Sequence, residues 1–200
     1  MAERSETQLV ARLLEFIETE LLPATGEAVS RGNKIFGGGM LRKSDLSTII
    51  VGTNNETENP LWHGEVHTIK RFYEMGRQNR PPPQDILFIA SHEPCPLCLS
   101  AITWAGYDNF YYLFSHEDSR DAFNIGHDLR ILQEVFRQPP GGYARTNAYW
   151  TGYPIKKLVG LCDDASRAGF QQQIARISDR YDALSDRYQS SKGENDIPLD

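Results

Sequence analysis

Two cysteines three residues apart are the clearest chemical feature of the chain. Cys95 and Cys98 lie within SHEPCPLC, and Pro96 between them suits the first turn of a helix. By themselves they could be half of a structural zinc site, a redox pair or a coincidence. A structural zinc site takes four protein ligands, but the chain has no second Cys-x-x-Cys, and Cys162 stands alone far along the sequence. The pair therefore needs partners from elsewhere in the chain.

The upstream stretch WHGEV offers such partners in His63 and Glu65. His63 and the two cysteines would give three protein ligands, which leaves a fourth position of a zinc ion open, as in catalytic sites. A helix that starts at Pro96 would also favour the thiolate forms of the cysteines, because a helix N-terminus carries partial positive charge. Glu65 could take a proton from water and deliver it to a ring nitrogen of a substrate whose amino group leaves as ammonia.

The elements that would position these residues alternate between helices and strands. Apolar periodicity predicts helices over residues 5–22, 63–78, 96–106, 128–137 and 163–189, and apolar runs predict strands over 34–41, 46–52, 85–91, 109–115 and 153–161. Residues 23–33 are expected to form a loop. The alternation predicts a three-layer α/β/α domain, and the polar turn RKSD between the first two strands predicts a hairpin and hence a mixed sheet.

The last predicted helix carries an apolar stripe at alternating steps of four and three residues: Phe170, Ile174, Ile177, Tyr181, Leu184 and Tyr188. Such a stripe can pack within the chain, on the sheet, or form a seam between two subunits. The polar residues 191–200 are predicted to be a disordered tail. No linker divides the rest, so we expect residues 1–190 to form a single domain.

Bulk properties exclude several classes of partner and location. The chain has 200 residues, 24% of them charged, and a net charge of −6, without the basic stripe expected of a nucleic-acid-binding surface. The first residues, MAERSETQ, contain no apolar signal core, and no stretch approaches the roughly 18 apolar residues of a membrane span. Three cysteines do not form a disulfide framework. We therefore expect a cytoplasmic protein with neither a membrane nor a nucleic-acid partner.

The two motifs together resemble a known superfamily. His-x-Glu followed by Pro-Cys-x-x-Cys is a signature of zinc deaminases, and NPLWHGEVHTI with HEPCPLCLSAITWAG resembles the cytidine and deoxycytidylate deaminase superfamily over roughly residues 34–128. The resemblance implies a cytidine-deaminase-like fold with about five strands, Zn²⁺ held by His63, Cys95 and Cys98, and Glu65 as the catalytic residue. It also implies an aminated base and water as reactants, and a homodimer.

Within the superfamily, EPCPLCLSAITWA most resembles guanine deaminases, and this implies three substrate contacts. The resemblance places Trp104 beside the substrate pocket and lets Asn54, in GTNN, hydrogen-bond the base. It places a second acidic group after the fourth strand, where Asp128 in IGHDL, or else the neighbouring His127, is the candidate. His67, His92 and His116 have no counterpart among the ligands, and we expect them to be structural or exposed.

Other residues leave the substrate open. Leu61 and Trp62 stand where guanine deaminases have a Thr-Ala pair, and Gly64 in HGE resembles fungal-type cytosine deaminases. The sequence therefore predicts a zinc-dependent hydrolytic deaminase of a free base such as guanine. Cytosine, cytidine, deoxycytidylate and the triazine ammeline are alternative substrates, and a zinc-stabilised binding domain without catalysis is the alternative from another class.

Overall fold

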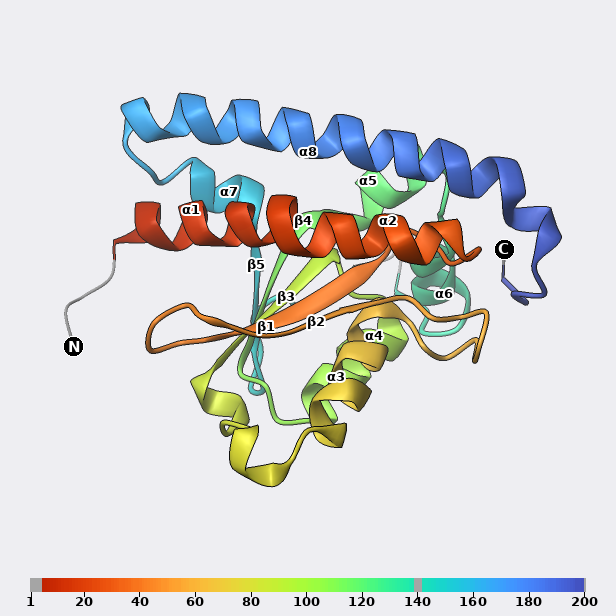
Figure 1. Ribbon diagram of the computed structural model, residues 1–200, viewed down its shortest axis with the longest axis horizontal. Helices are drawn as coiled ribbons and strands as arrows, with labels where there is room; N and C mark the ends of the chain where they lie inside the picture. The colour runs from red at the N-terminus through yellow and green to blue at the C-terminus, as the bar shows by residue number, and fades with distance from the viewer. Residues whose placement is uncertain (1–4, 139–141, 200) are drawn as a thin grey trace.

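A five-stranded mixed sheet forms the centre of the structure, a computed structural model that describes residues 5–138 and 142–199 (Figure 1). The strand order is β2-β1-β3-β4-β5, with β1 antiparallel to β2 and β3, and β4 parallel to β3 and β5. The strands are β1 (Gly37–Arg42), β2 (Thr48–Thr53), β3 (Ile86–His92), β4 (Asn109–Phe114) and β5 (Thr151–Pro154). The predicted hairpin and mixed sheet are confirmed.

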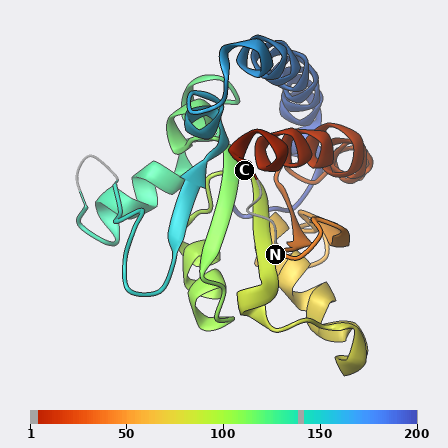
Figure 2. The ribbon, with the colours of Figure 1, turned by 90° about the vertical axis from the view of Figure 1, so that its left-hand side faces the viewer.

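Helices cover both faces of the sheet (Figure 2). Figure 1 shows α1, α2 and α8 on one face, with α8 outermost, and α3 and α4 on the other. Shorter helices follow β4 and β5. The helices are α1 (Glu6–Phe16), α2 (Leu22–Ser30), α3 (Gly64–Glu74), α4 (Pro96–Trp104), α5 (His116–Asp121), α6 (His127–Glu134), α7 (Ile155–Val159) and α8 (Asp164–Ser191). The three-layer α/β/α class predicted from the sequence is confirmed.

The central strand β3 sends alternate side chains into two apolar cores. Leu87 and Ile89 belong to the core on the α1 and α8 side, whereas Phe88 and Ala90 belong to the core on the α3 and α4 side. Every residue of β3 is buried, which explains why its sequence is a continuous apolar run rather than an alternating one. The strand thereby fixes the start of α4, which follows it after three residues.

The segment 23–33 is the first departure from the sequence prediction. It was expected to be a loop after Leu22, but Leu22–Ser30 form α2, which continues α1 through a π-helical turn at Ile17–Leu21. Pro23 lies in the first turn of α2, where its missing N–H is tolerated. The sequence pattern predicts that the helix ends before Pro23. The π-helical turn lets the helix continue through this proline instead.

The segment 153–161 is the second departure. Only its first two residues lie in β5, and Ile155–Val159 form α7. Ile155 and Val159 are both buried in the core on the α8 side, and their spacing of four is that of a helix face rather than a strand. A short apolar run is ambiguous between the two structures.

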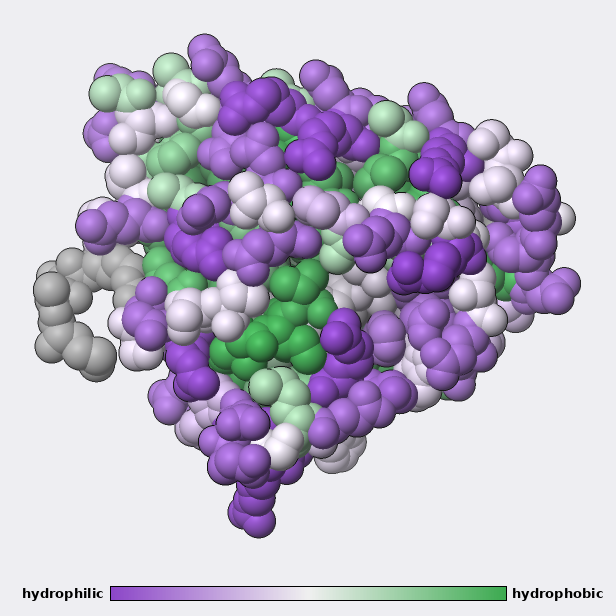
Figure 3. All heavy atoms as spheres, viewed as in Figure 1, coloured by the Kyte–Doolittle hydropathy of each residue, from purple (hydrophilic) through white to green (hydrophobic). Residues whose placement is uncertain are grey.

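The stripe on α8 packs within the chain. Ile177, Tyr181 and Tyr188 are buried in the core that α1 and α2 share with the sheet, and the Tyr181 ring meets Phe114 at 5.2 Å between centroids. Figure 3 shows that the opposite side of α8 is mostly hydrophilic. Of the two interpretations of the stripe, the structure favours packing within the chain. The stripe therefore gives no support to a seam between subunits.

The C-terminal segment has a defined course, although its composition predicts disorder. After α8 it forms a short 3₁₀ turn, η4 (Lys192–Glu194), and then buries the side chain of Ile197. The Leu199 carbonyl accepts a hydrogen bond from Lys34 Nζ at 2.5 Å, and Asn195 Nδ2 donates to the carbonyl of Gly32 at 3.2 Å. Composition cannot show such point contacts. Residue 200 lies outside the described residues.

Within the described ranges 5–138 and 142–199, no helix combines the length and the apolar character that crossing a membrane requires. The longest helix is α8, with 28 residues. Its polar residues lie toward solvent, as Figure 3 shows.

Gly64 makes a close approach between α3 and the backbone of β1, and its replacement tests the packing that holds the site. A Cβ atom at this position would lie 2.7 Å from Gly37 Cα and 2.8 Å from Gly37 N, and these are backbone atoms of β1 that cannot move aside cheaply. We expect Gly64→Ala to lower the free energy of unfolding by about 1–3 kcal/mol, as measured by urea denaturation.

Gly169→Ala in α8 is the matched control for this prediction. A Cβ atom at Gly169 meets nothing within 4 Å, so alanine should raise stability by about 0.5–1 kcal/mol through its higher helix propensity. Equal stability of the two variants would contradict the close approach at Gly64.

Candidate active site

Two helix N-termini bring the three predicted zinc ligands together. His63 is the N-cap residue of α3, Cys95 is the N-cap residue of α4, and Cys98 lies in the first turn of α4. The Cys95 Sγ atom is 3.4 Å from His63 Nδ1 and 3.5 Å from Cys98 Sγ, and one ligand atom from each residue lies within 4.8 Å of the others. The chain therefore gathers one imidazole nitrogen and two sulfurs at a single point.

These separations fit a zinc ion. With Zn–S bonds of about 2.3 Å and a Zn–N bond of about 2.0 Å, tetrahedral geometry puts the two sulfurs about 3.8 Å apart and a sulfur and the nitrogen about 3.5 Å apart. The observed 3.5 and 3.4 Å differ from these values by a few tenths of an ångström. Three ligands from the protein are the donor set of a catalytic rather than a structural zinc site.

The electrostatics of the cluster favour the thiolate form of Cys95. Hydrogen bonding between the two sulfur atoms lowers the pKa of Cys95 well below its ordinary value, because this effect and the stabilisation of the thiolate by His63 outweigh burial. Burial lowers the pKa of His63, but the hydrogen bond and charge of Cys95, with the nearby carboxylates, raise it to about 9. A thiolate is the form of cysteine that binds metal, so Cys95 is prepared for that role.

Glu65 lies beside the cluster in the first turn of α3. Its side chain is buried, and its Oε2 accepts a hydrogen bond from Cys98 Sγ at 3.2 Å. Burial raises the pKa of Glu65 to about 7, and the negative charge of Cys95 adds to this effect. A carboxyl group that titrates near neutral pH can both accept and donate a proton, which is the behaviour expected of a proton shuttle.

The cluster opens onto a cavity of about 490 Å³, a size typical of sites for small molecules. Glu65, Asp128 and His127 are all on its wall. Burial raises the pKa of Asp128 well above its ordinary value, and the charge of Cys95 raises it further. Much of the remaining wall is apolar, including Phe36, Leu61, Ile125, Ile131, Phe136 and Leu199.

Trp104 does not lie beside the cavity, in contrast to the prediction. It is the last residue of α4 and is 91% exposed. It lies six positions after Cys98, so its side chain points about 240° around the helix and lies about 9 Å further along the axis. The two residues therefore cannot face the same small molecule within one chain.

Asn54 also differs from its predicted role as a contact to the base. It is 1% exposed and does not line the cavity. Its Oδ1 accepts a hydrogen bond from the backbone N–H of Gly64, and its Nδ2 donates to Glu56 Oε2 at 2.5 Å. Both ends of the amide have protein partners, and Asn54 thereby holds the start of α3.

The three other histidines considered in the sequence lie outside the ligand cluster. His67 Nδ1 is 2.8 Å from the Thr53 carbonyl oxygen, and His116 Nε2 is 3.1 Å from the Pro94 carbonyl oxygen. His92 packs among aromatic rings, of which Phe36 is 4.8 Å away between centroids. Burial lowers the pKa of His92 to about 3, so its ring is neutral, as a core residue requires.

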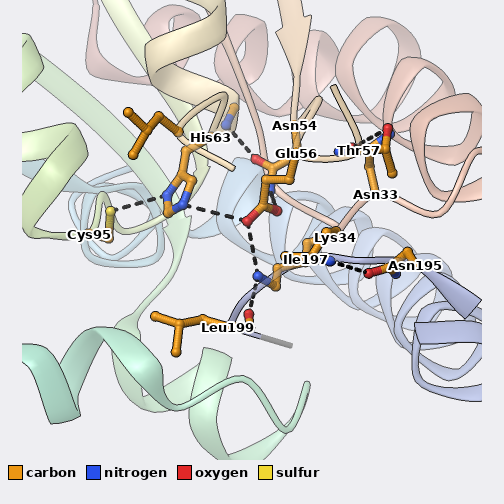
Figure 4. A network of polar contacts seen from close by, with 12 residues as sticks. Asn33, Lys34, Asn54, Glu56, Thr57, His63, Cys95, Asn195, Ile197 and Leu199 are labelled. Carbon is orange, nitrogen blue, oxygen red and sulfur yellow. Dashed lines mark hydrogen bonds and ion pairs between the residues drawn. The ribbon is translucent and has the colours of Figure 1, made fainter. Parts of the chain in front are cut away.

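No motif in the sequence indicates the polar residues that support the cluster. Lys34 and Glu56 form a buried ion pair with 3.0 Å between Nζ and Oε1, and Glu56 Oε1 is also 3.6 Å from His63 Nε2 (Figure 4). On the other side, Glu93 accepts hydrogen bonds from Tyr143 at 2.6 Å and Arg145 at 2.8 Å. Glu93 lies two residues before Cys95, and these bonds fix that segment.

Comparisons with known proteins agree with this geometry. The sequence model of the cytidine and deoxycytidylate deaminase zinc-binding region matches residues 17–114. The chain is 34% identical over 127 residues to a protein of Bacillus subtilis (strain 168) named guanine deaminase, covering 61% of this chain and 78% of the relative.

Solved structures of similar proteins include two guanine deaminases. The X-ray structure of guanine deaminase from Bacillus subtilis is 25% identical, with 66% of this chain and 79% of that chain covered and a TM-score of 0.48. The structure from Nitrosomonas europaea is 16% identical, with 88% and 87% covered and a TM-score of 0.49. The zinc cofactor predicted from the sequence is confirmed by the family match and the cluster. The chain belongs to the family of zinc-binding cytidine and deoxycytidylate deaminases, which are hydrolases of carbon–nitrogen bonds.

Proposed function

We propose that the protein deaminates a free nucleobase, with guanine as the first candidate. The observation that carries this proposal is the position of Glu65 between the His63–Cys95–Cys98 cluster and a cavity of a size for one small molecule. The 34% identity to a protein named guanine deaminase supports the choice of base. In the proposed reaction, water replaces an amino group on the heterocycle, and ammonia leaves.

The residues of the site have two proposed roles, metal binding and proton transfer. His63, Cys95 and Cys98 would hold zinc, which when bound supplies Lewis acidity that makes water a better nucleophile at neutral pH. Glu65 takes one proton from the attacking water and passes it to a ring nitrogen. It then takes the second proton from the hydroxyl group now on the ring carbon and delivers it to the departing amino group, so that a carbonyl group remains and ammonia leaves. Asp128, on the cavity wall, is the proposed hydrogen-bonding partner of the base.

The charges around the cavity favour a neutral substrate over a nucleotide. Lys34 is the one lysine or arginine among the described residues that line the cavity, and its Nζ is already paired with Glu56 at 3.0 Å. Glu65, Glu93 and Asp128 add carboxyl groups to the same wall. A phosphate group brought into this cavity would lose water without gaining a free cation, which is unfavourable.

Ammonia release over a panel of bases tests the proposal. We expect the highest kcat/KM for guanine and the lowest for deoxycytidylate within a panel that also contains cytosine, cytidine, adenine and ammeline, because only deoxycytidylate carries a phosphate. The measurement is ammonia release with zinc content determined on the same sample. Activity confined to deoxycytidylate would refute the free-base proposal, and bound zinc without any ammonia release would favour a binding domain.

The homodimer and the cytoplasmic location stay predictions. The α8 stripe no longer supports a dimer, because its residues are buried in, or packed against, the core of one chain. Trp104 at 91% and Tyr149 at 70% exposure remain as large aromatic side chains at the surface near the end of α4. Exposed aromatic groups of this kind are enriched at protein interfaces, so this surface is the proposed place of contact.

A further inference from the structure

The two ring nitrogens of His63 face different partners. Nδ1 lies 3.4 Å from Cys95 Sγ and is the nitrogen on the metal side, whereas Nε2 lies 3.6 Å from Glu56 Oε1 (Figure 4). A histidine that binds a metal through one nitrogen carries a proton on the other, and a carboxylate facing that proton fixes the tautomer and orients the ring. We propose that Glu56 is a positioning residue for His63, and that Lys34 holds Glu56 in place.

The carboxylate of Glu56 is fixed on both oxygens. Oε1 is 3.0 Å from Lys34 Nζ, and Oε2 accepts a hydrogen bond from Asn54 Nδ2 at 2.5 Å. The side chains of Glu56 and Lys34 are 2% and 7% exposed. A buried carboxylate with a cation and an amide as partners has few alternative orientations, so its Oε1 stays directed at the imidazole ring.

The same network reaches the backbone next to His63. Asn54 donates to Glu56 through Nδ2 and accepts from the backbone N–H of Gly64 through Oδ1. Gly64 directly follows His63 and is the first residue of α3. Glu56 is therefore tied, through one residue, to the main chain that carries the ligand, as well as facing the ligand's ring.

A second role for Glu56 has to be separated from this one. Lys34 is buried, and a buried ammonium group without a counter-charge is costly. Glu56 could therefore be present only to neutralise Lys34. In that case its loss would matter for folding, and removing both charges together would restore the zinc site.

Zinc affinity, measured by competition with a chelator, distinguishes the two roles. The inference rests on the proposed ligand set of His63, Cys95 and Cys98. Glu56→Gln should weaken zinc binding about 10- to 100-fold, the usual effect of losing a carboxylate that orients a metal-bound histidine. The control is Glu58→Gln, because Glu58 lies two residues away, is exposed and only accepts a hydrogen bond from Asn55. It should keep the affinity of the wild type.

The double variant Lys34→Met/Glu56→Gln leaves no buried charge unpaired and serves as the test even where the single variant folds poorly. Weak zinc binding in a folded double variant, judged by circular dichroism and thermal unfolding, would support the positioning role. Recovery of wild-type affinity in the double variant would overturn it and leave the proposed ligand set intact. A wild-type protein that binds no zinc would instead refute the ligand set, and this inference with it.

Discussion

Glu65→Gln is expected to lose nearly all ammonia release while it keeps both zinc and the fold. Glu65 is not one of the three ligand residues, and its carboxylate is the acidic group in hydrogen-bond contact with the cluster, 3.2 Å from Cys98 Sγ. General acid–base catalysis contributes about 100- to 10,000-fold per proton transfer, and here one group serves more than one transfer. Glutamine has nearly the same shape, so a cavity cannot explain the loss. The measurements are kcat on the best substrate, zinc content and the unfolding midpoint.

Glu74→Gln provides the control within the same helix. Glu74 ends α3, far from its first turn, and pairs with Lys70 at the surface. Its replacement should leave kcat unchanged, because it removes the same charge without touching the cluster. If Glu65→Gln released ammonia at nearly the normal rate, Glu65 would not move the protons, and the proposed mechanism would have to be abandoned.

His63→Ala and Cys98→Ser are expected to lose zinc and activity together. Each removes one of three protein ligands, and this should cost more affinity than the 10- to 100-fold typical of residues that only orient a ligand. Elemental analysis of protein purified without added metal should give about one zinc per chain for the wild type, since the residues form one three-ligand site, and almost none for the variants.

Cys162→Ser separates the effect of the site from that of losing any cysteine. Cys162 is buried in the core on the α8 side, where its Sγ is 3.5 Å from the Leu158 carbonyl oxygen. It belongs to neither helix of the cluster, so its serine variant should retain zinc. Full zinc content after Cys98→Ser would count against the ligand set.

The ligand cluster was predictable because local geometry determines most of it. Cys95 and Cys98 are one helical turn apart at the start of α4, and Glu65 is two residues from His63 at the start of α3. Pro96 marks the start of α4 in the sequence, because proline suits the first turn of a helix. Only the meeting of the two helices required the family resemblance.

The supporting residues could not be predicted, because the fold decides their neighbours. Lys34 and Glu56 are 22 residues apart, and in the sequence each resembles an ordinary surface charge. The resemblance to guanine deaminases predicts that Asn54 contacts the base, but its hydrogen bonds go to Gly64 and Glu56. A buried polar group needs hydrogen-bonding partners. The sequence alone does not show which residues the fold brings close enough to be those partners.

Helix and strand boundaries failed where one local signal was given too much weight. Pro23 in the sequence predicts a helix end at Leu22, but a π-helical turn places this proline in the first turn of α2. The apolar run after β5 suggested a strand, and its spacing of four at Ile155 and Val159 suits a helix face equally well. In both cases burial in the shared core decided the outcome rather than intrinsic preference.

The ammonium group of Lys34 takes part both in the polar network around His63 and in the contacts of the C-terminal segment. The Lys34 ammonium group donates to the Glu56 carboxylate at 3.0 Å and to the Leu199 carbonyl at 2.5 Å. The C-terminal segment and the surroundings of His63 therefore compete for, or share, the same donor, and their free energies are coupled. Such coupling is reciprocal. A change that releases the C-terminal segment alters the Lys34–Glu56 ion pair that faces His63, and a change at His63 alters how firmly the segment is held.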